Sequence, residues 1–270
     1  MSGQLRIGVA GCKGRMGRTI VDAVVAAEGA QLAGGSARPD DPWVGQDLGT
    51  LTGHGALDAP VVGDPMELVQ RADAVIDFTT PDLTVKHAEL AAQAGITLVI
   101  GTTGLSDDQQ DAIRRAARHV AIVQAPNMSL GVNLLLNLVQ QVAAALDPNF
   151  DIEITEMHHR HKKDAPSGTA LALGRAAADG RKVVLDQVAD RGRDGDTGER
   201  TPGNIGFAAL RGGDVAGEHT VIFAGPGERI ELSHKASSRG IFGQGAVKAA
   251  LWARAQDPGL YSMQDVLGIT

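Results

Sequence analysis

The chain has 270 residues and a formal net charge of −7 at pH 7, enough for one large domain or two smaller ones. Aromatic residues make up only 3%, and this scarcity, together with the acidic balance, argues against nucleic acid as a partner. A single cysteine, Cys12, excludes an internal disulfide and fits a reducing compartment. Because no apolar run could cross a bilayer and no leader pattern opens the chain, we expect a cytoplasmic protein with no membrane partner.

The first element is a short apolar strand over residues 5–10, followed by a glycine-rich turn and a helix. Strand, glycine turn and helix form the context of a dinucleotide-binding site. The glycines are spaced G-x-x-G-x-x-G rather than G-x-G-x-x-G. We expect Gly11 to make the tight turn, Gly14 to let a pyrophosphate approach, and Gly17 to let the helix pack on the strand. An ordinary glycine-rich turn between strand and helix is the alternative.

The second predicted strand, residues 31–36, ends in Ser36-Ala37-Arg38. A site that prefers NAD places Asp or Glu near this end to bind the ribose hydroxyls. Here the acid is missing and an arginine is present, which suits a 2′-phosphate. We therefore predict NADPH as the preferred cofactor, with NADH possible. The alternative is that Arg38 is an ordinary surface cation.

The next 90 residues alternate strand and helix patterns. Residues 39–60 are rich in Gly, Pro and Asp and predict a loop. Capping motifs predict helix starts at 64–67, 79–82 and 106–109, and unbroken apolar runs predict buried parallel strands at 74–78, 96–100 and 120–124. This alternation indicates an α/β fold with a doubly wound parallel sheet of the Rossmann type.

Ligands of such sheets bind at the carboxyl ends of the strands. Gly101, Thr102 and Thr103 follow one strand, and residues 125–128 follow the next. Both segments are therefore candidate walls of a nicotinamide pocket. For each, simple turn chemistry is the alternative.

The second half predicts an α+β domain with a mixed sheet. The expected elements are a helix over 131–146, a strand over 151–157, a helix over 167–179, a mobile loop or lid over 186–203, a strand over 207–213, a hairpin of strands 219–223 and 229–234, and a last helix over 244–255. We expect a dinucleotide-binding domain at 1–128, a substrate-binding and oligomerisation domain at 129–239, and a C-terminal helix region at 240–270 that returns to the first domain.

Three histidines, an arginine and two lysines occupy residues 158–163, between a predicted strand and a helix start at Ser167. Unpaired N–H groups at a helix start attract an anion, and imidazoles can move protons near neutral pH. Gly168 would let a ligand approach the backbone, and Thr169 offers a hydroxyl. This combination predicts a small polyanion, such as a carboxylate, that takes up a proton during reaction.

Two other interpretations of this segment are a solvated charged face and a zinc site built from its histidines. Neighbouring cations repel a metal ion and no cysteine lies nearby, so we predict no metal. If strand alternation persists, His158 lies on the face of Ile152 and Ile154 and His159 on the opposite face. The two imidazoles should then have separate tasks.

Five motifs spread over nearly the whole chain form a pattern: Gly11–Gly17, Asp77–Thr79, Gly101–Gly104, Glu156–Ala170 and Arg211–His219. Together they resemble the bacterial dihydrodipicolinate (4-hydroxy-tetrahydrodipicolinate) reductases of lysine and diaminopimelate synthesis. The His-His-Arg-His-Lys block followed by Ala-Pro-Ser-Gly-Thr is highly specific, whereas the glycine loop alone is not. The resemblance implies a reductase that transfers hydride from NADPH or NADH to ring carbon four of a small cyclic dicarboxylate, forming tetrahydrodipicolinate, with a proton added at the neighbouring carbon.

The resemblance also implies roles for single residues. His158 and Lys162 match the proton-transfer residues, with His158 as general acid or the residue that orients it. His159, Gly168 and Thr169 match substrate-binding residues. The matching cofactor contacts are Gly11, Cys12, Lys13, Gly14, Arg15, Met16, Arg38, Gly101, Thr102, Thr103, Ala125, Pro126, Asn127 and Met128.

Two further points follow from the resemblance. Many relatives carry an acid where this chain has Ala37, so efficient use of NADH is not expected. The family forms homotetramers through the sheet of its second domain. Residues 221–223 and 230–232 carry few charges, which also suggests that a partner subunit covers their sheet.

Rival functions fit the sequence less well. A non-enzymatic NADP(H)-binding protein would keep the glycine loop but would not need the cationic loop at a helix start. Another two-domain reductase, such as a semialdehyde or homoserine dehydrogenase, is a second possibility. A phosphorylating semialdehyde dehydrogenase needs a catalytic thiol, and the only thiol is Cys12, in the glycine turn.

Overall fold

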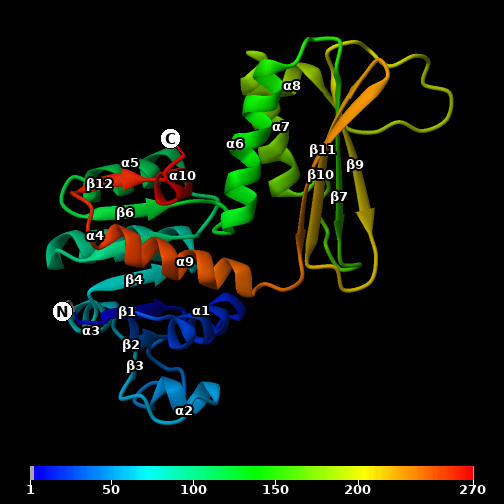
Figure 1. Ribbon diagram of the computed structural model, residues 1–270. Coiled ribbons are helices and arrows are strands. Elements are labelled where there is room, and N and C mark those ends of the chain that lie inside the picture. Colours follow the sequence, from blue (N-terminus) through cyan, green and yellow to red (C-terminus); the bar gives the residue numbers. More distant parts are fainter. Residues whose placement is uncertain (1–2, 270) are drawn as a thin grey trace. The chain divides into compact units, whose positions relative to one another are not determined.

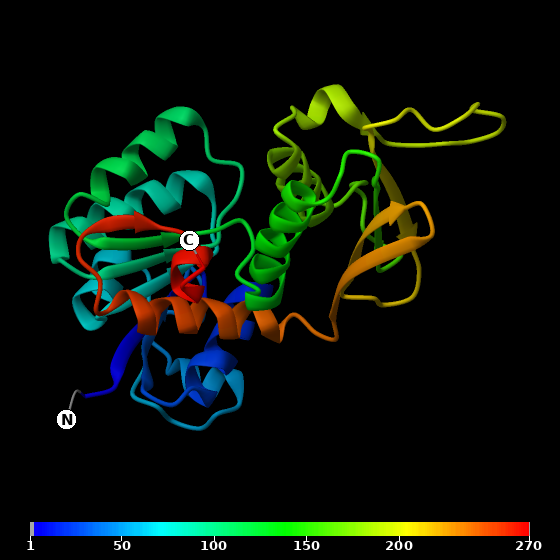
Figure 2. The same cartoon turned by 45° about the horizontal axis from the view of Figure 1, so that its top comes forward.

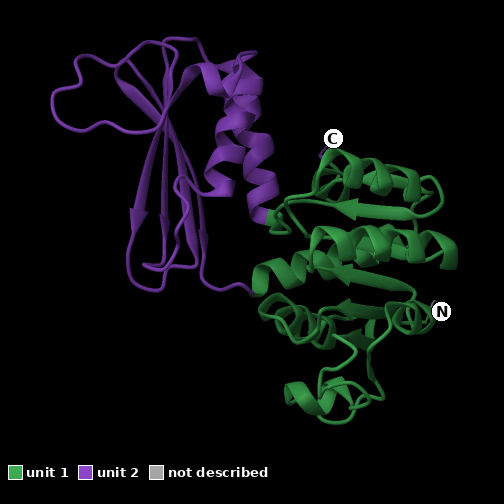
Figure 3. Ribbon diagram, turned by 180° about the vertical axis from the view of Figure 1, so that it is seen from behind, with its two compact units in different colours: residues 1–130, 240–268, 270 green, residues 131–239, 269 purple. Residues whose placement is uncertain are grey.

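The computed structural model describes residues 3–269, which form two compact units (Figure 3). The first unit combines the chain up to Leu130 with Gly240–Gly268, and the second holds Gly131–Arg239 and Ile269. The sequence placed the corresponding boundaries at 128/129 and 239/240. No helix among residues 3–269 is long and apolar enough to span a membrane.

The first unit is built on a seven-stranded sheet in which all the paired strands run parallel. Its strand order is β12-β6-β5-β4-β1-β2-β3. The strands are β1 (Leu5–Ala10), β2 (Ala30–Ser36), β3 (Val61–Val62), β4 (Ala74–Asp77), β5 (Thr97–Ile100), β6 (Ala121–Gln124) and β12 (Gly259–Tyr261). The predicted doubly wound, Rossmann-type sheet is confirmed.

Helices cover both faces of this sheet (Figure 1). On one face lie α1 (Arg15–Ala26), α9 (Gly240–Ala253), α10 (Met263–Leu267) and α2 (Leu48–Thr52), and on the other α3 (Pro65–Arg71), α4 (Pro81–Ala94) and α5 (Asp107–Ala116). Successive strand residues alternate between two cores: Val75 packs on the α3–α5 side and Ile76 on the α1–α9 side. This two-sided burial explains why these strands are apolar without interruption.

Capping residues start α3 and α5 where the sequence predicted, whereas Thr80, the residue before α4, makes no capping hydrogen bond with its side chain. The Asp64 side chain accepts a hydrogen bond from the amide of Met66 at the start of α3. Ser106 and Gln109 form a reciprocal capping box at the start of α5. These local bonds satisfy amides that have no partner within the helix, so they fix the helix starts independently of the rest of the fold.

Some predictions for the first unit were wrong. Residues 39–60 are not all loop, because Asp47 caps the short helix α2. The last long helix begins at Gly240 rather than at residue 244. The sequence did not predict β12, which pairs with β6 at the edge of the parallel sheet, or the helix α10 that follows it.

The second unit has a mixed five-stranded sheet in the order β11-β10-β7-β9-β8. Its strands are β7 (Asp151–His158), β8 (Ala189–Asp190), β9 (Ile205–Arg211), β10 (Gly217–Gly225) and β11 (Glu228–Ala236). Helices α6 (Leu130–Ala145) and α7 (Gly168–Arg181) pack on one face, where Leu135, Val139 and Leu173 meet Ile154 and Phe223. The predicted α+β unit with a mixed sheet is confirmed.

Two expectations about the second unit need correction. The segment 186–203 begins with the short helix α8 (Leu185–Val188) and the strand β8, and only the remainder is the long loop seen in Figure 2. The apolar residues Val221 and Phe223 need no partner subunit to cover them, because both are fully buried in the core that α6 and α7 cover. The opposite face of β10 and β11 carries polar side chains such as Glu218, Thr220 and Lys235, together with Ile222.

Candidate active site

The glycine turn between β1 and α1 is shaped by close backbone packing. Gly11 has φ +64°, a conformation that favours glycine. A β-carbon on Gly17 would lie 2.3 Å from the carbonyl oxygen of Gly11 and 2.7 Å from the backbone of Cys12. Gly17 therefore lets α1 pack directly on the turn, as the spacing predicted. Gly14 precedes the first residue of α1 and has no side chain to cap the helix, so the helix start is bare.

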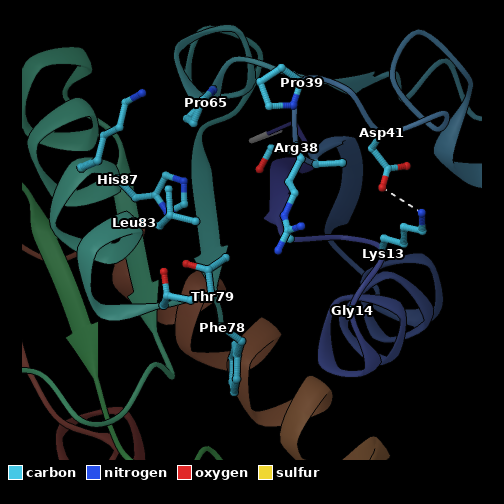
Figure 4. Close-up of a pocket in the computed structure, with 16 residues that line it drawn as sticks. Lys13, Gly14, Arg38, Pro39, Asp41, Pro65, Phe78, Thr79, Leu83 and His87 are labelled. Carbon is cyan, nitrogen blue, oxygen red and sulfur yellow. Dashed lines mark hydrogen bonds and ion pairs between the residues drawn. The ribbon is translucent and has the colours of Figure 1, made fainter.

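A cavity of about 640 Å³ opens beside this turn within the first unit (Figure 4). Residues from the turn, the end of β2, the end of β4 and the helix α4 line it, including Gly11, Gly14, Ser36, Arg38, Thr79 and His87. The bare turn, the exposed Arg38 and this volume fit the phosphates and the adenosine half of a dinucleotide.

Charged groups at the cavity are partly paired. Lys13 Nζ bonds Asp41 Oδ2 at 2.8 Å, and this bond holds the pKa of Asp41 below its usual value. Lys13 and Arg18 both lie over the ring of Trp43, at 5.8 and 5.1 Å from its centroid. Arg38 also lines the cavity and is exposed. Asp41 is thus an acid at the cavity wall, although the sequence showed none directly after β2.

The predicted cofactor residues do not all gather in this cavity. Thr102, Thr103, Ala125 and Pro126 line a separate hollow of about 490 Å³ in the same unit, at the ends of β5 and β6. Gly101 lies against the Phe78 ring, where a β-carbon would come within 2.2 Å of Cζ. Arg15 and Met16 are the first residues of α1 and line neither hollow. The Asn127 side chain accepts a hydrogen bond from the amide of Ser129, which shapes the loop after β6.

Two of the predicted contacts have side chains buried in the core. Cys12 and Met128 are 0% and 1% exposed and pack in the cluster on the α1–α9 side. Burial raises the pKa of the Cys12 thiol to about 11, so the thiol stays protonated and unreactive. Only the backbone of these two residues could contact a cofactor.

A buried polar network supports the wall of the larger cavity. Asp77 at the end of β4 accepts hydrogen bonds from the amide and hydroxyl of Thr79, at 2.8 and 2.6 Å, and its other oxygen lies 3.0 Å from His87 Nδ1. Thr84 Oγ1 donates to Thr102 Oγ1 at 2.9 Å. Sequence reasoning did not identify His87, which comes into the cavity wall only because β4 and α4 bring it beside Asp77.

In the second unit, β7 carries the predicted proton-transfer residue. Its burial alternates strictly, and Ile152, Ile154, Glu156 and His158 all point to the face covered by helices. The prediction that His158 shares a face with the two isoleucines is confirmed. The strand ends at His158, so the basic loop begins where the alternation stops.

The side chain of Glu156 accepts four hydrogen bonds at this end of the sheet. Its Oε2 accepts from His158 Nδ1 at 2.6 Å and from Arg211 Nη1 at 2.8 Å. Its Oε1 accepts from Arg211 Nη2 at 2.9 Å and from the amide of Ser167 at 3.0 Å. Burial opposes ionisation of this carboxyl, but the hydrogen bonds from Arg211 and His158 outweigh it, so the pKa of Glu156 lies below its ordinary value.

The second predicted catalytic residue, Lys162, is paired. Its Nζ bonds both oxygens of Asp164, at 2.8 and 2.9 Å, and its side chain is 20% exposed. The Lys162 bonds hold the pKa of Asp164 below its usual value. Lys162 also lies near enough to His159 and His219 for its charge to lower the pKa of each.

His159 has a polar atom that no protein group satisfies. Among residues 3–269, its Nδ1 is buried without a hydrogen-bond partner. Desolvation, followed by the charges of Arg239 and His161, lowers the pKa of His159, so its ring is neutral at pH 7. A neutral imidazole with a buried, unpartnered nitrogen fits a residue that hydrogen-bonds a ligand.

A further histidine, His219 on β10, packs beside His158, with the two rings 5.1 Å apart at 75°. Burial, together with the neighbouring charge of His158, lowers the pKa of His219 to about 4. Its Nε2 lies 3.0 Å from Ser167 Oγ, and Ser167 Oγ also caps α7 by accepting from the amide of Ala170. The predicted N-cap at Ser167 is therefore confirmed.

The start of α7 leaves space for a ligand. No atom lies within 4 Å of the position that a β-carbon would take on Gly168, the first helical residue. Thr169 follows in the same turn. The structure thus brings His158, His159, Lys162, Gly168 and Thr169 to one end of the second unit, at the end of β7 and the start of α7.

Comparison with known proteins covers both units. Residues 5–128 match the N-terminal region of dihydrodipicolinate reductase, and residues 131–267 match its C-terminal region. The 4-hydroxy-tetrahydrodipicolinate reductase of Dinoroseobacter shibae is 56% identical over 97% of both chains. One such reductase of Mesorhizobium japonicum is also 56% identical, over 100% of this chain and 99% of its own.

The chain belongs to the dihydrodipicolinate reductase family. It is an oxidoreductase with 4-hydroxy-tetrahydrodipicolinate reductase activity in lysine biosynthesis, and members of this family use a nicotinamide cofactor. A solved dihydrodipicolinate reductase from a Paenisporosarcina species, with dipicolinate bound, aligns with a TM-score of 0.79 and 25% identity over 97% of this chain and 98% of its own. An NAD complex of the gentamicin-biosynthesis protein GenD2 aligns at 0.59 with 16% identity, covering 100% and 92%, and shares the fold alone.

Sequence reasoning assigned no role to four residues of this dihydrodipicolinate reductase that the structure places among the predicted ones. Glu156 and His219 lie inside motifs that carried the resemblance, and alternation along their strands could have marked them as buried. Arg211 also opens one of these motifs, but its bond to Glu156 joins distant segments, and Arg239 lies outside all five motifs. Among residues 3–269, no cluster of three or more His, Cys, Asp or Glu could hold a metal ion.

Proposed function

We propose that the second unit binds 4-hydroxy-tetrahydrodipicolinate, a cyclic dicarboxylate, and that His158 supplies the proton for its reduction to tetrahydrodipicolinate. The main support is the 2.6 Å bond between Glu156 and His158 Nδ1, which holds an imidazole in one orientation next to the start of α7. A related structure has dipicolinate bound, which supports a ligand of this class.

The start of α7 and the basic loop would bind the substrate carboxylates. The open space at Gly168 lets a carboxylate reach the backbone of the first helical turn. Thr169 adds a hydroxyl, and the unpartnered Nδ1 of His159 offers a neutral hydrogen-bonding group. Lys162 would leave Asp164, a loop carboxylate with 62% of its side chain exposed, to pair with a substrate carboxylate or to assist proton transfer.

A bound nicotinamide cofactor supplies the hydride. Hydride addition to a conjugated imine builds negative charge on the ring, and a proton must neutralise that charge at the neighbouring carbon. A protonated His158 can deliver this proton and then remain as a neutral ring, because Glu156 stays ionised beside it. Lys162 adds a positive charge that stabilises the same negative charge.

The turn Gly11–Gly14 and Arg38 would hold the cofactor, and we expect a preference for NADPH over NADH. Arg38 lines the cavity beside the turn and is exposed, as a 2′-phosphate ligand must be. Asp41, in the cavity wall, is an acid that could bind a ribose hydroxyl. Its Oδ2, however, is already paired with Lys13 Nζ at 2.8 Å. NADH is therefore a possible but weaker donor.

A steady-state assay tests both parts of this proposal. The upstream condensation product of aspartate semialdehyde and pyruvate is supplied, and oxidation of NADPH and of NADH is followed separately. We expect oxidation of both, with a ratio of kcat/KM for NADPH over NADH above one. If neither cofactor is oxidised, the proposed substrate is refuted. A ratio of kcat/KM for NADPH over NADH well below one would refute the proposed preference for NADPH.

We also propose that the chain acts in the cytoplasm and forms a homotetramer, the latter as the family resemblance implies. The helix-free face of the second sheet carries Leu210, which is 55% exposed, and Ile222 on the same face. Both are apolar groups that a partner subunit could cover. Sedimentation equilibrium should give a mass near four times 27.9 kDa, and a monomer at micromolar concentration would contradict it.

A further inference from the structure

The hydrogen bonds around Glu156 determine which ring nitrogen of His158 carries the hydrogen. An ionised carboxylate accepts hydrogen bonds and donates none, and the pKa of Glu156 is lowered by Arg211 and His158 against the cost of burial. His158 Nδ1, at 2.6 Å from Oε2, must therefore carry the hydrogen. In the neutral ring this assigns the free lone pair to Nε2.

The other nitrogen of His158 lies beside a glycine. A β-carbon on Gly217, at the start of β10, would lie 3.0 Å from His158 Nε2 and 3.4 Å from its Cδ2. A side chain at this position would crowd that side of the ring. The ring is thus fixed at Nδ1 by a carboxylate, and its reactive edge lies beside a residue without a side chain.

We propose that Glu156 is the positioning residue of proton transfer: its Oε2 holds the hydrogen of His158 on Nδ1, so that Nε2 is the atom that gives the proton to the substrate. This inference rests on the proposed function of His158. The proton leaves Nε2 of the imidazolium for a ring carbon, and the neutral imidazole keeps its second hydrogen on Nδ1, bonded to Glu156.

The carboxylate of Glu156 also links His158 to the start of α7, where the substrate carboxylates are proposed to bind. Its Oε1 accepts from the amide of Ser167, the cap of α7. Arg211 bridges both oxygens and also donates to the carbonyl of Asp164, so one bidentate pair ties together β7, β9 and the basic loop. The titratable and charged groups around His158 are Glu156, His159, Lys162, Asp164, Arg211 and His219.

Replacing Glu156 by glutamine should reverse the tautomer of His158. Each carboxylate oxygen faces two donors, and an amide NH₂ group cannot accept a hydrogen bond. If the NH₂ replaces Oε1, it meets the Ser167 amide and Arg211 Nη2, neither of which can stop donating. If it replaces Oε2, it meets Arg211 and His158 Nδ1, and the imidazole can adapt by moving its hydrogen to Nε2. The second arrangement is the less costly one.

The kinetic test compares wild type, Glu156→Gln and Glu153→Gln across pH. Glu153 is the matched control, because it lies on the same strand, faces the opposite side and pairs with Arg193 and Arg200. In Glu156→Gln we expect kcat to fall at least about tenfold with KM for the dicarboxylate nearly unchanged. The alkaline limb of the kcat profile should move at least about one pH unit lower, because a neutral amide stabilises an imidazolium less than a carboxylate does.

Glu153→Gln should give a pH profile that superimposes on that of wild type. A Glu156→Gln enzyme with the wild-type alkaline limb, or one that loses only substrate affinity, would overturn the inference. If wild type itself does not reduce the dicarboxylate, the proposed function fails instead, so the two failures are distinguishable.

A second measurement needs neither the Glu156→Gln variant nor an activity assay. Nitrogen NMR of histidine-labelled wild type, with the His158 signals assigned by their loss in His158→Gln, reports which ring nitrogen carries the hydrogen. At a pH where the ring is neutral, we expect the hydrogen on Nδ1. A hydrogen on Nε2 would overturn the inference whatever the kinetics show.

Discussion

Three residues donate four hydrogen bonds to the carboxylate of Glu156, and these bonds determine what each neighbouring side chain can do. Arg211 keeps the carboxylate ionised, the carboxylate orients His158, and Ser167 connects it to α7. Leaving a buried carboxylate without its partners costs far more than an exposed ion pair contributes. The orientation of His158, the proposed proton donor, therefore depends on Arg211 and Ser167 as well as on Glu156.

Substitution of the two predicted proton-transfer residues should have different effects. His158→Gln removes the proton donor but not the substrate seat, so we expect kcat to fall at least about 100-fold with a modest change in KM. Lys162→Cys removes a charge that would both bind and assist, so kcat and KM should both worsen. Steady-state kinetics with NADPH measure both effects. Near-normal turnover in both variants would refute these roles.

Prediction from the sequence succeeded at this scale where the information was local. His158 could be placed because strand alternation carries through β7 to its last residue. Glu156 lies on the same face, but its importance depends on Arg211, 55 positions away, and no periodic pattern reports such a pairing. The Nδ1 atom of His159 is likewise known to lack a partner only when every neighbour is placed.

At the scale of elements, glycines at two helix starts have opposite purposes. Gly17 in α1 has backbone atoms within 2.7 Å of its would-be β-carbon, and Gly168 in α7 has none within 4 Å. The first glycine is required by packing, while the second lies at an exposed helix start where the backbone is open to a ligand.

Alanine at each position separates these purposes. Gly17→Ala should lower the free energy of unfolding by at least about 2 kcal/mol, because the backbone it meets cannot move aside. Gly168→Ala should change stability by less than about 0.5 kcal/mol. It should raise KM for the dicarboxylate about tenfold, because a methyl group keeps a carboxylate from the backbone amides. Urea denaturation and kinetics measure the two effects, and a KM unchanged in Gly168→Ala would contradict the proposed substrate seat.

Helices and strands could likewise be predicted from the sequence where neighbouring residues determine them, but not where a distant segment does. Asp64 and Ser106 reveal α3 and α5 because a cap is a contact between neighbours in sequence. Strand β12 has only three residues and exists because β6 pairs with it from more than 130 positions away. The two-residue β8 depends in the same way on β9. Such short strands have no pattern of their own to recognise.

At the scale of the whole molecule, buried neutral histidines make stability depend on pH. The pKa of His219 is about 4 in the folded chain because the ring is buried, whereas an exposed histidine has a pKa near 6.5. The unfolded chain therefore takes up a proton first as pH falls. The stabilising contribution is complete above pH 6.5 and is lost as pH falls towards 4.

We expect the free energy of unfolding to decrease by up to about 3 kcal/mol between pH 7 and pH 4 through this group, since about 2.5 pH units separate the two pKa values. The lowered pKa of His159 and of His234 in the same unit act in the same direction. Urea denaturation at several pH values measures the slope. His219→Gln should reduce it, while substitution of the exposed His119 should leave it unchanged. An unchanged slope in His219→Gln would show that another group is responsible.

The division of the chain into two units affects how the protein folds while the ribosome synthesises it. The first unit is assembled from two stretches, and α9 from the second stretch packs on α1 from the first. A ribosome finishes Gly131–Arg239, which is continuous, before it makes the residues that cover the apolar side of α1. Nascent chains thus carry an uncovered hydrophobic surface for more than one hundred codons, and chaperone binding during translation should concentrate on that interval.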